Sequence, residues 1–146
     1  MKLSVLLFCL LFTGLVAFSI SPPDAAAKRA PVLGLKGHMG PHGKGWGKVR
    51  PKRIYNGGVP SGLVRQIRWR GWGRKVAKGV GRGSQYRPEG GYYARSVKVR
   101  LRAKRIGRCF RGGPRAYTVL VAQFQNRPGG RFGRWFAWGS TLCTRP

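Results

Sequence analysis

Acidic side chains are nearly absent from this chain of 146 residues. Only Asp24 and Glu89 carry a carboxylate, against 30 lysines and arginines, and the formal net charge is +28 at pH 7. General acid–base catalysis usually depends on a carboxylate or on a positioned histidine. The shortage of carboxylates therefore favours a protein that is not an enzyme, and we predict no catalytic residue.

The N-terminal residues have the pattern of an export signal. Lys2 precedes an almost wholly apolar run over residues 3–20, and the small residues 25–27 form an A-x-A cleavage pattern. We predict a signal peptide over residues 1–27. A retained anchor is the alternative, because an apolar run of about 18 residues can just span a bilayer. Cleavage would remove Asp24 and leave Glu89 as the sole carboxylate, which excludes a catalytic carboxylate pair and a Ser-His-Asp triad.

Cysteine is scarce as well. Cys9 lies inside the apolar run, so only Cys109 and Cys143 survive cleavage. An even number of cysteines in an exported chain predicts a disulfide. This disulfide would close a loop of about 34 residues and stabilise the fold by roughly 3–4 kcal/mol. Two free thiols are the alternative, and a thiol nucleophile would further need a histidine brought to it.

Histidines are limited to His38 and His42. Their i, i+4 spacing would suit a metal on a helix, but Met39-Gly40-Pro41 between them prevents a regular helix. Two imidazoles without a carboxylate support adventitious binding of copper or zinc at most. We predict no dedicated metal site, no cofactor and no small-molecule substrate.

The excess of basic residues points to the class of partner. Loss of residues 1–27 would leave 119 residues with the same net charge of +28. Like charges at that density repel one another unless counterions or a polyanion screen them. The expected partner is an anionic polymer outside the cell, either a wall polymer, a nucleic acid or an acidic polysaccharide, with an anionic membrane surface as a further possibility. Codon composition alone is the competing explanation for the many arginines.

Residues 28–58 have the composition of a linker. Of these 31 residues, 8 are glycine, 3 are proline and 8 are lysine or arginine, and the only aromatic residues are Trp46 and Tyr55. Such a segment buries too little apolar surface to offset the entropy of ordering it. We predict a flexible basic arm that precedes a folded domain over residues 59–146.

The clearest strand pattern covers residues 97–104, which alternate strictly between apolar and basic side chains. A period of two places one set on a buried face and the other on an exposed face. The apolar set is Val97, Val99, Leu101 and Ala103, and the basic set is Lys98, Arg100, Arg102 and Lys104.

Other segments also have strand patterns. Residues 116–124 are apolar on both faces, which is typical of a central strand, and residues 132–138 form an aromatic-rich strand. Residues 75–81 form a weaker strand in which small residues on one face leave room for large neighbours. In residues 63–70, Leu63, Ile67 and Trp69 share a face that Arg65 interrupts. Glycine-rich turns separate the strands, so we predict an all-β fold, either a small sandwich or a barrel-like sheet. A polycation that is disordered throughout is the alternative.

The basic strand face is the sharpest functional signal in the sequence. Residues on one face of a strand recur about every 6.6–7 Å, so the basic set of residues 97–104 would form a row of charge about 20 Å long. Five further cations could extend this row if the first strands share the sheet: Arg65, Arg68, Arg70, Arg74 and Lys75. Of these we assign Arg68 and Arg70 to the anion-binding site. Trp72 and Trp135 could stack on bases or sugar rings if they are exposed, whereas Trp69 and Trp138 are expected in the core. The alternative is that the cations only solvate a surface.

A series of short motifs resembles a known family. Ile67-x-Trp69-x-x-Trp72-Gly73 is followed by Ala77-x-Gly79-x-Gly81, Val97-x-Val99-x-Leu101, Cys109 and Tyr117-Thr118-x-Leu120. Over residues 60–124 this order is similar to that of a secreted actinobacterial domain of unknown function. The resemblance implies an all-β fold and export, and it implies no catalytic residue. That family is less basic and richer in threonine and serine, so the resemblance does not explain the polycationic surface.

These observations support a secreted or envelope-associated protein that binds anionic polymers without catalysis. A cationic antimicrobial or membrane-active factor is a second hypothesis, which the lack of an amphipathic helix weakens. A structural domain without a specific ligand is a third.

Overall fold

The computed structural model describes residues 30–139 and 141–144, and over these residues the protein is built from β-strands. The predicted all-β class is confirmed, and no α-helix occurs in the described ranges. A short 3₁₀ turn, η1 (Pro60–Gly62), precedes the third strand. The strands are β1 (Val32–Leu33), β2 (Ile54–Tyr55), β3 (Leu63–Arg70), β4 (Val76–Gly83), β5 (Val97–Arg108), β6 (Arg115–Phe124) and β7 (Phe136–Ala137).

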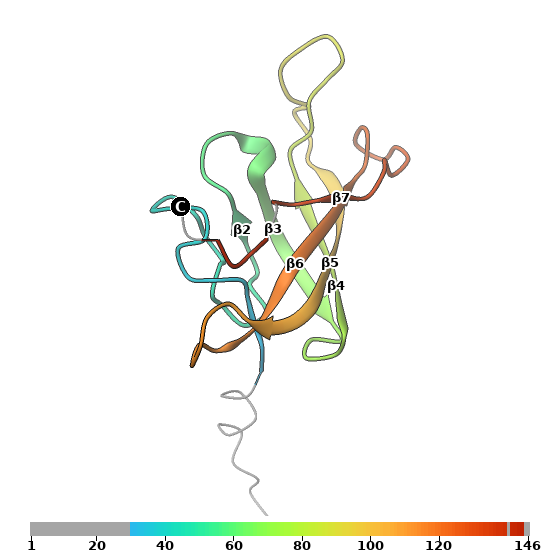
Figure 1. Ribbon diagram of the computed structural model, residues 1–146. Helices are drawn as coiled ribbons and strands as arrows, with labels where there is room; N and C mark the ends of the chain where they lie inside the picture. The colour runs from blue at the N-terminus through green and yellow to red at the C-terminus, as the bar shows by residue number, and fades with distance from the viewer. Residues whose placement is uncertain (1–29, 140, 145–146) are drawn as a thin grey trace, which may run out of the picture.

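All seven strands belong to one sheet with the order β1-β6-β5-β4-β3-β2, and β7 pairs with β6. Strands β3 to β6 form an antiparallel meander, while β1 pairs with β6 in parallel. The sheet curls like half of a barrel, and the connection between β4 and β5 projects away from it as a long loop (Figure 1). Of the two predicted architectures, a sandwich and a barrel-like sheet, the structure therefore matches the barrel-like sheet.

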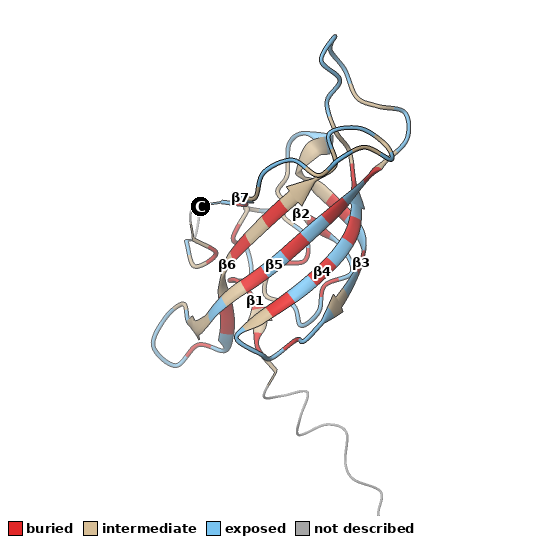
Figure 2. Ribbon diagram, turned by 90° about the vertical axis from the view of Figure 1, so that its right-hand side faces the viewer, coloured by how far each residue is buried: buried red, intermediate tan, exposed pale blue. Residues whose placement is uncertain are grey.

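Strand β5 follows the predicted alternation. Its apolar residues up to position 103 are buried, and they face the core, while Lys98, Arg100 and Arg102 are exposed. Buried and exposed residues alternate in the same way along β4, so bands of each kind cross the sheet (Figure 2). The pattern separates an apolar inner face from a polar outer face.

Strand β3 contains a bulge that the sequence pattern did not reveal. The pairing with β4 shifts between Arg65 and Arg68, and Gln66 has a positive φ of 54°. The extra residue lets Val64 and Ile67 both face the core, although they are three positions apart. The prediction that Leu63 and Ile67 share a face was therefore wrong. The bulge after Arg65 adds one residue to β3, so the inward-facing positions change from even to odd numbers there.

The glycines of β4 make room for large neighbours, as predicted. A Cβ at Gly79 would lie 2.9 Å from the Trp69 ring, and one at Gly81 would lie 2.7 Å from a Val64 methyl group. Both distances are shorter than van der Waals contact, so the core packs against bare backbone at these two positions.

Gly81→Ala should therefore lower the free energy of unfolding by about 1–3 kcal/mol, because the methyl group must displace Val64 in a packed core. Gly107→Ala on β5 is the matched control, since its Cβ would lie 3.7 Å from the nearest atom, a Thr118 methyl group. Urea denaturation of both variants measures the difference. Equal stability of the two variants would contradict the close packing of β4.

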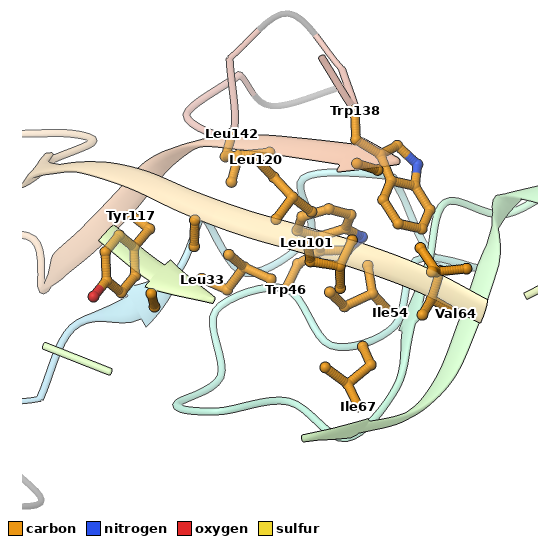
Figure 3. Packing of buried hydrophobic residues seen from close by; sticks show 14 of the residues in the cluster. Leu33, Trp46, Ile54, Val64, Ile67, Leu101, Tyr117, Leu120, Trp138 and Leu142 are labelled. Atoms are coloured by element: carbon orange, nitrogen blue, oxygen red, sulfur yellow. The ribbon is translucent and has the colours of Figure 1, made fainter. Parts of the chain in front are cut away.

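The prediction of a flexible arm over residues 28–58 is wrong for the described part of that segment. Leu33 and Ile54 are wholly buried and Trp46 is 4% exposed, and all three lie among the side chains of the sheet (Figure 3). The compositional argument failed because the segment needs few apolar contacts: glycines with positive φ, such as Gly34 and Gly47, turn the chain so that isolated apolar residues reach the core.

Only Phe136–Ala137 of the predicted strand over residues 132–138 is a strand, and Phe132 forms an isolated bridge with Gln125. Residues 133–135 form no strand pairs with β6, and Phe132 and Trp135 lie instead against Arg100 and Arg102 on the outer face of the sheet. The predicted signal peptide, residues 1–27, lies outside the described residues.

Tyr117 links β6 to the turn after β3. Its ring is fully buried against Trp72, its hydroxyl donates to the Arg74 carbonyl at 2.7 Å, and the Gly73 N–H donates to it at 2.8 Å. Burial raises the pKa of this phenol above its ordinary value of 10.0, against smaller opposing effects of the Gly73 N–H and Arg115. The folded state thus holds the phenolic proton more tightly than the unfolded state does.

The stabilisation from this proton is full below about pH 10 and is lost as pH rises through the raised pKa of Tyr117. Tyr117→Phe should lower the free energy of unfolding by about 1–3 kcal/mol at neutral pH, because the Gly73 N–H and the Arg74 carbonyl lose their partner. In this variant the free energy of unfolding should also fall less steeply as the pH rises above about 10. Urea denaturation from neutral to alkaline pH measures both effects. Tyr55→Phe is the control, and an unchanged alkaline decline in Tyr117→Phe would contradict this role.

Candidate anion-binding face

The outer face of β3, β4 and β5 carries a set of cations that we call the basic face. Sequence reasoning placed six residues in this site, and the structure brings all six onto these strands. Lys104 is half-buried and the others are exposed. Two members were missed, Lys78 and Arg82, although they alternate with small residues on β4. Arg65, which pairs with Arg82, is exposed on the same side. The basic face consists of Arg65, Arg68, Arg70, Lys78, Arg82, Lys98, Arg100, Arg102 and Lys104.

The strand register aligns these cations in cross-strand rows. Arg70 pairs with Lys78, which pairs with Arg102, and Arg82 pairs with Lys98. Neighbouring strands lie about 4.7–4.9 Å apart, so like charges stand directly beside one another across the sheet. Each row therefore raises the positive potential at the next.

No acidic side chain offsets this charge within the described ranges. The one carboxylate there, Glu89, lies in the loop between β4 and β5, where it is exposed and 3.7 Å from Arg87. The cations of the basic face thus have no carboxylate partner in the described part of the chain. An anion from outside would reduce their mutual repulsion.

Aromatic rings position two of these arginines. The Arg100 guanidinium lies 3.9 Å from the centre of the Phe132 ring, and that of Arg102 lies 4.3 Å from the Trp135 ring. The segment that carries both rings is anchored to β6, since the Gln123 side-chain amide donates to the Gly133 carbonyl at 2.8 Å. These contacts restrict where the two guanidinium groups lie, and the N–H groups at the edges of each fork can still donate to an anion.

Of the four tryptophans discussed from the sequence, two are buried, Trp72 and Trp138, and two are half-buried, Trp69 and Trp135. Trp72 is only 9% exposed, donates to the Pro31 carbonyl at 2.7 Å and packs edge-on against Trp69, so its predicted stacking role is wrong. The turn after β3 directs it inward. Trp135 is half-buried against Arg102. Trp138 is a core residue, as expected, and Trp69 is half-buried at the edge of the core.

Two hollows open onto the basic face. The larger, which we call the bulge hollow, measures about 490 Å³ and adjoins the β3 bulge. Its polar lining consists of Lys52, Gln66, Arg68, Arg82 and Lys98. The smaller, of about 340 Å³, lies between β4, β5 and Trp135 and includes Lys78, Arg100 and Arg102. Both hollows present cations to a ligand.

Groups capable of covalent or metal chemistry are scarce in residues 30–139 and 141–144. Cys109 and Cys143 form the predicted disulfide, so neither is a free thiol. His38 is buried, and its Nδ1 donates to the Thr144 carbonyl at 3.0 Å beneath Trp46. No three His, Cys, Asp or Glu side chains gather there as metal ligands.

The two rings contribute to binding by orienting the arginines. Replacing Phe132 and Trp135 together with leucine keeps the net charge but removes both cation–π contacts, each worth about 0.5–1 kcal/mol at an exposed site. We expect a three- to tenfold lower affinity for a polyanion, measured by fluorescence anisotropy. Phe110→Leu, at an exposed ring in the turn after β5, is the control. Unchanged affinity in the double variant would show that the rings only fill space.

Comparison with known proteins gives no relative: no protein-family model, no curated protein and no solved structure matches this chain. The resemblance of residues 60–124 to a secreted actinobacterial domain stays a prediction.

Proposed function

We propose that this is an exported, non-catalytic protein that binds anionic polymers at its basic face, either free outside the cell or at the envelope. One observation carries the proposal: the register of β3, β4 and β5 aligns nine cations on one surface, and no carboxylate lies among them. A merely solvated surface would gain stability from interspersed acids. Anionic polymers outside the cell, such as wall polymers, nucleic acids and acidic polysaccharides, would supply the negative charge that the basic face lacks.

Polymer binding is favoured over membrane disruption. Membrane-active cationic proteins insert aromatic or aliphatic side chains below the headgroups. Here Trp46, Trp72 and Trp138 are buried, and Trp135 lies against Arg102. The exposed rings, Tyr86, Phe110 and Phe136, come from three different segments: the β4–β5 loop, the turn after β5 and β7. Dye release from anionic vesicles tests this alternative, and we expect the vesicles to stay intact.

The salt dependence of binding tests the proposal. Each neutralised phosphate releases counterions, so log K should fall linearly with log salt. If six to eight cations of the basic face engage duplex DNA, the slope is about −5 to −7. Affinities for DNA, isolated wall polymer and heparin are measured over the same salt series. Flat affinity for all three polymers would contradict the proposal.

A further inference from the structure

We propose that the bulge hollow is a discrete binding site for a phosphate-bearing unit of the anionic polymer. This inference rests on the proposed function and adds a fixed site to a surface otherwise described only by its charge. Four cations line the hollow, and each comes from a different segment of the chain. They are Lys52 from the residues before β2, Arg68 from β3, Arg82 from β4 and Lys98 from β5.

Backbone strain lies at the centre of this hollow. Gln66 lines it with a φ of 54°, in the left-handed region that side-chain-bearing residues rarely adopt. Such conformations cost on the order of 1–3 kcal/mol, and strained residues and bulges both gather at functional sites. The bulge removes Gln66 from the regular ladder and places a neutral amide donor among the four cations.

Hydrogen bonds fix the segments that carry the cations. The Ile67 N–H donates to the Lys52 carbonyl at 3.0 Å, which holds Lys52 beside the bulge. The Lys98 N–H donates to the Gln125 side-chain oxygen at 2.9 Å. The backbone that carries Lys52 and Lys98 is therefore held in place beside the bulge, and the hollow is open in the protein without a ligand.

The donor set suits phosphate better than carboxylate. A carboxylate offers two oxygens and one charge, whereas the hollow presents two guanidinium forks, two ammonium groups and one amide. A volume of about 490 Å³ exceeds the size of a single phosphate. The hollow therefore has room for two linked phosphates, or for one phosphate with the sugar or alditol that bears it.

Isothermal titration calorimetry with pyrophosphate at low ionic strength tests the inference. We expect saturable binding of one pyrophosphate per protein, and Lys52→Gln with Arg82→Gln should weaken it at least about tenfold. The matched control removes one lysine and one arginine elsewhere, by Lys48→Gln with Arg111→Gln, both at exposed positions, and should change affinity less than twofold. Tricarballylate, whose charge comes from three carboxylates, should bind more weakly than pyrophosphate.

Three results would overturn the inference: equal weakening in both variants, stoichiometry well above one, or tricarballylate binding as tight as pyrophosphate. Proton–nitrogen spectra of the unaltered protein give a second measurement that does not depend on variants. Pyrophosphate should shift the amides of Gln66 and Gly81 first, and evenly spread shifts would count against a discrete site.

Polymer binding in the same variants separates this inference from the proposed function. If the polymers bind with steep salt dependence but pyrophosphate fails these tests, the hollow is only part of a diffuse cationic surface and the proposed function stands. If polymer binding is flat with salt, the proposed function fails and the inference fails with it.

Discussion

Replacing Lys98, Arg100, Arg102 and Lys104 together with glutamine lowers the affinity for duplex DNA by about 10²–10³ at moderate salt. The reason is that each lost cation removes about one unit from the slope of log K against log salt, so the slope becomes shallower by about four. Glutamine keeps the length and polarity of these side chains, so the fold should survive. Fluorescence anisotropy over a salt series measures both the affinity and the slope.

The matched control removes two lysines and two arginines from another part of the surface. Lys44, Lys48, Arg50 and Arg53 are all exposed, and they lie on the segment that packs against the concave side of the sheet. Their replacement with glutamine leaves the same net charge as the first variant. We expect a loss of affinity below about tenfold, and equal losses in the two variants would mean that only net charge matters.

Loss of the disulfide has the largest expected effect on stability. Cys109 and Cys143 are separated by 34 positions, and a loop of that length predicts a stabilisation of about 3–4 kcal/mol. Cys109→Ala with Cys143→Ala should therefore lower the melting temperature by about 15 °C for a domain of this size. Calorimetry measures this shift.

The disulfide secures the C-terminal segment to the core. Leu142, beside Cys143, is 1% exposed and exchanges backbone hydrogen bonds with Leu35 and Thr118. Adding reductant to the double variant is the control and should change nothing further, whereas reductant should destabilise the unaltered protein. A stability loss below about 1 kcal/mol would show that the packing of Leu142 alone secures this end.

Strict alternation made the core strands predictable. Residues 97–104 alternate without exception, and the structure pairs them in uninterrupted register with β4 over the whole range and with β6 from Val99 onward. The same alternation identified four members of the basic face by number. The small residues at 77, 79 and 81 correctly indicated that large side chains pack over β4.

The features that sequence reasoning missed depend on contacts between distant segments. The bulge at Gln66 is visible only once β3 is paired with β4, because the sequence shows merely an interrupted apolar pattern. Likewise, Trp46 and Ile54 lie in a glycine-rich segment whose folding depends on a core supplied by later residues. The contacts of Arg100 with Phe132, and of Arg102 with Trp135, join residues more than 30 positions apart.

Mapping the binding surface tests the central claim most directly. Proton–nitrogen spectra recorded during titration with a short oligodeoxythymidine report which backbone amides meet the ligand. The account predicts that the largest shifts occur at Lys78, Arg82 and Arg100, in the middle of the basic face. Shifts concentrated in residues 36–50, or spread evenly over the surface, would contradict the assignment of binding to the outer face of β3, β4 and β5.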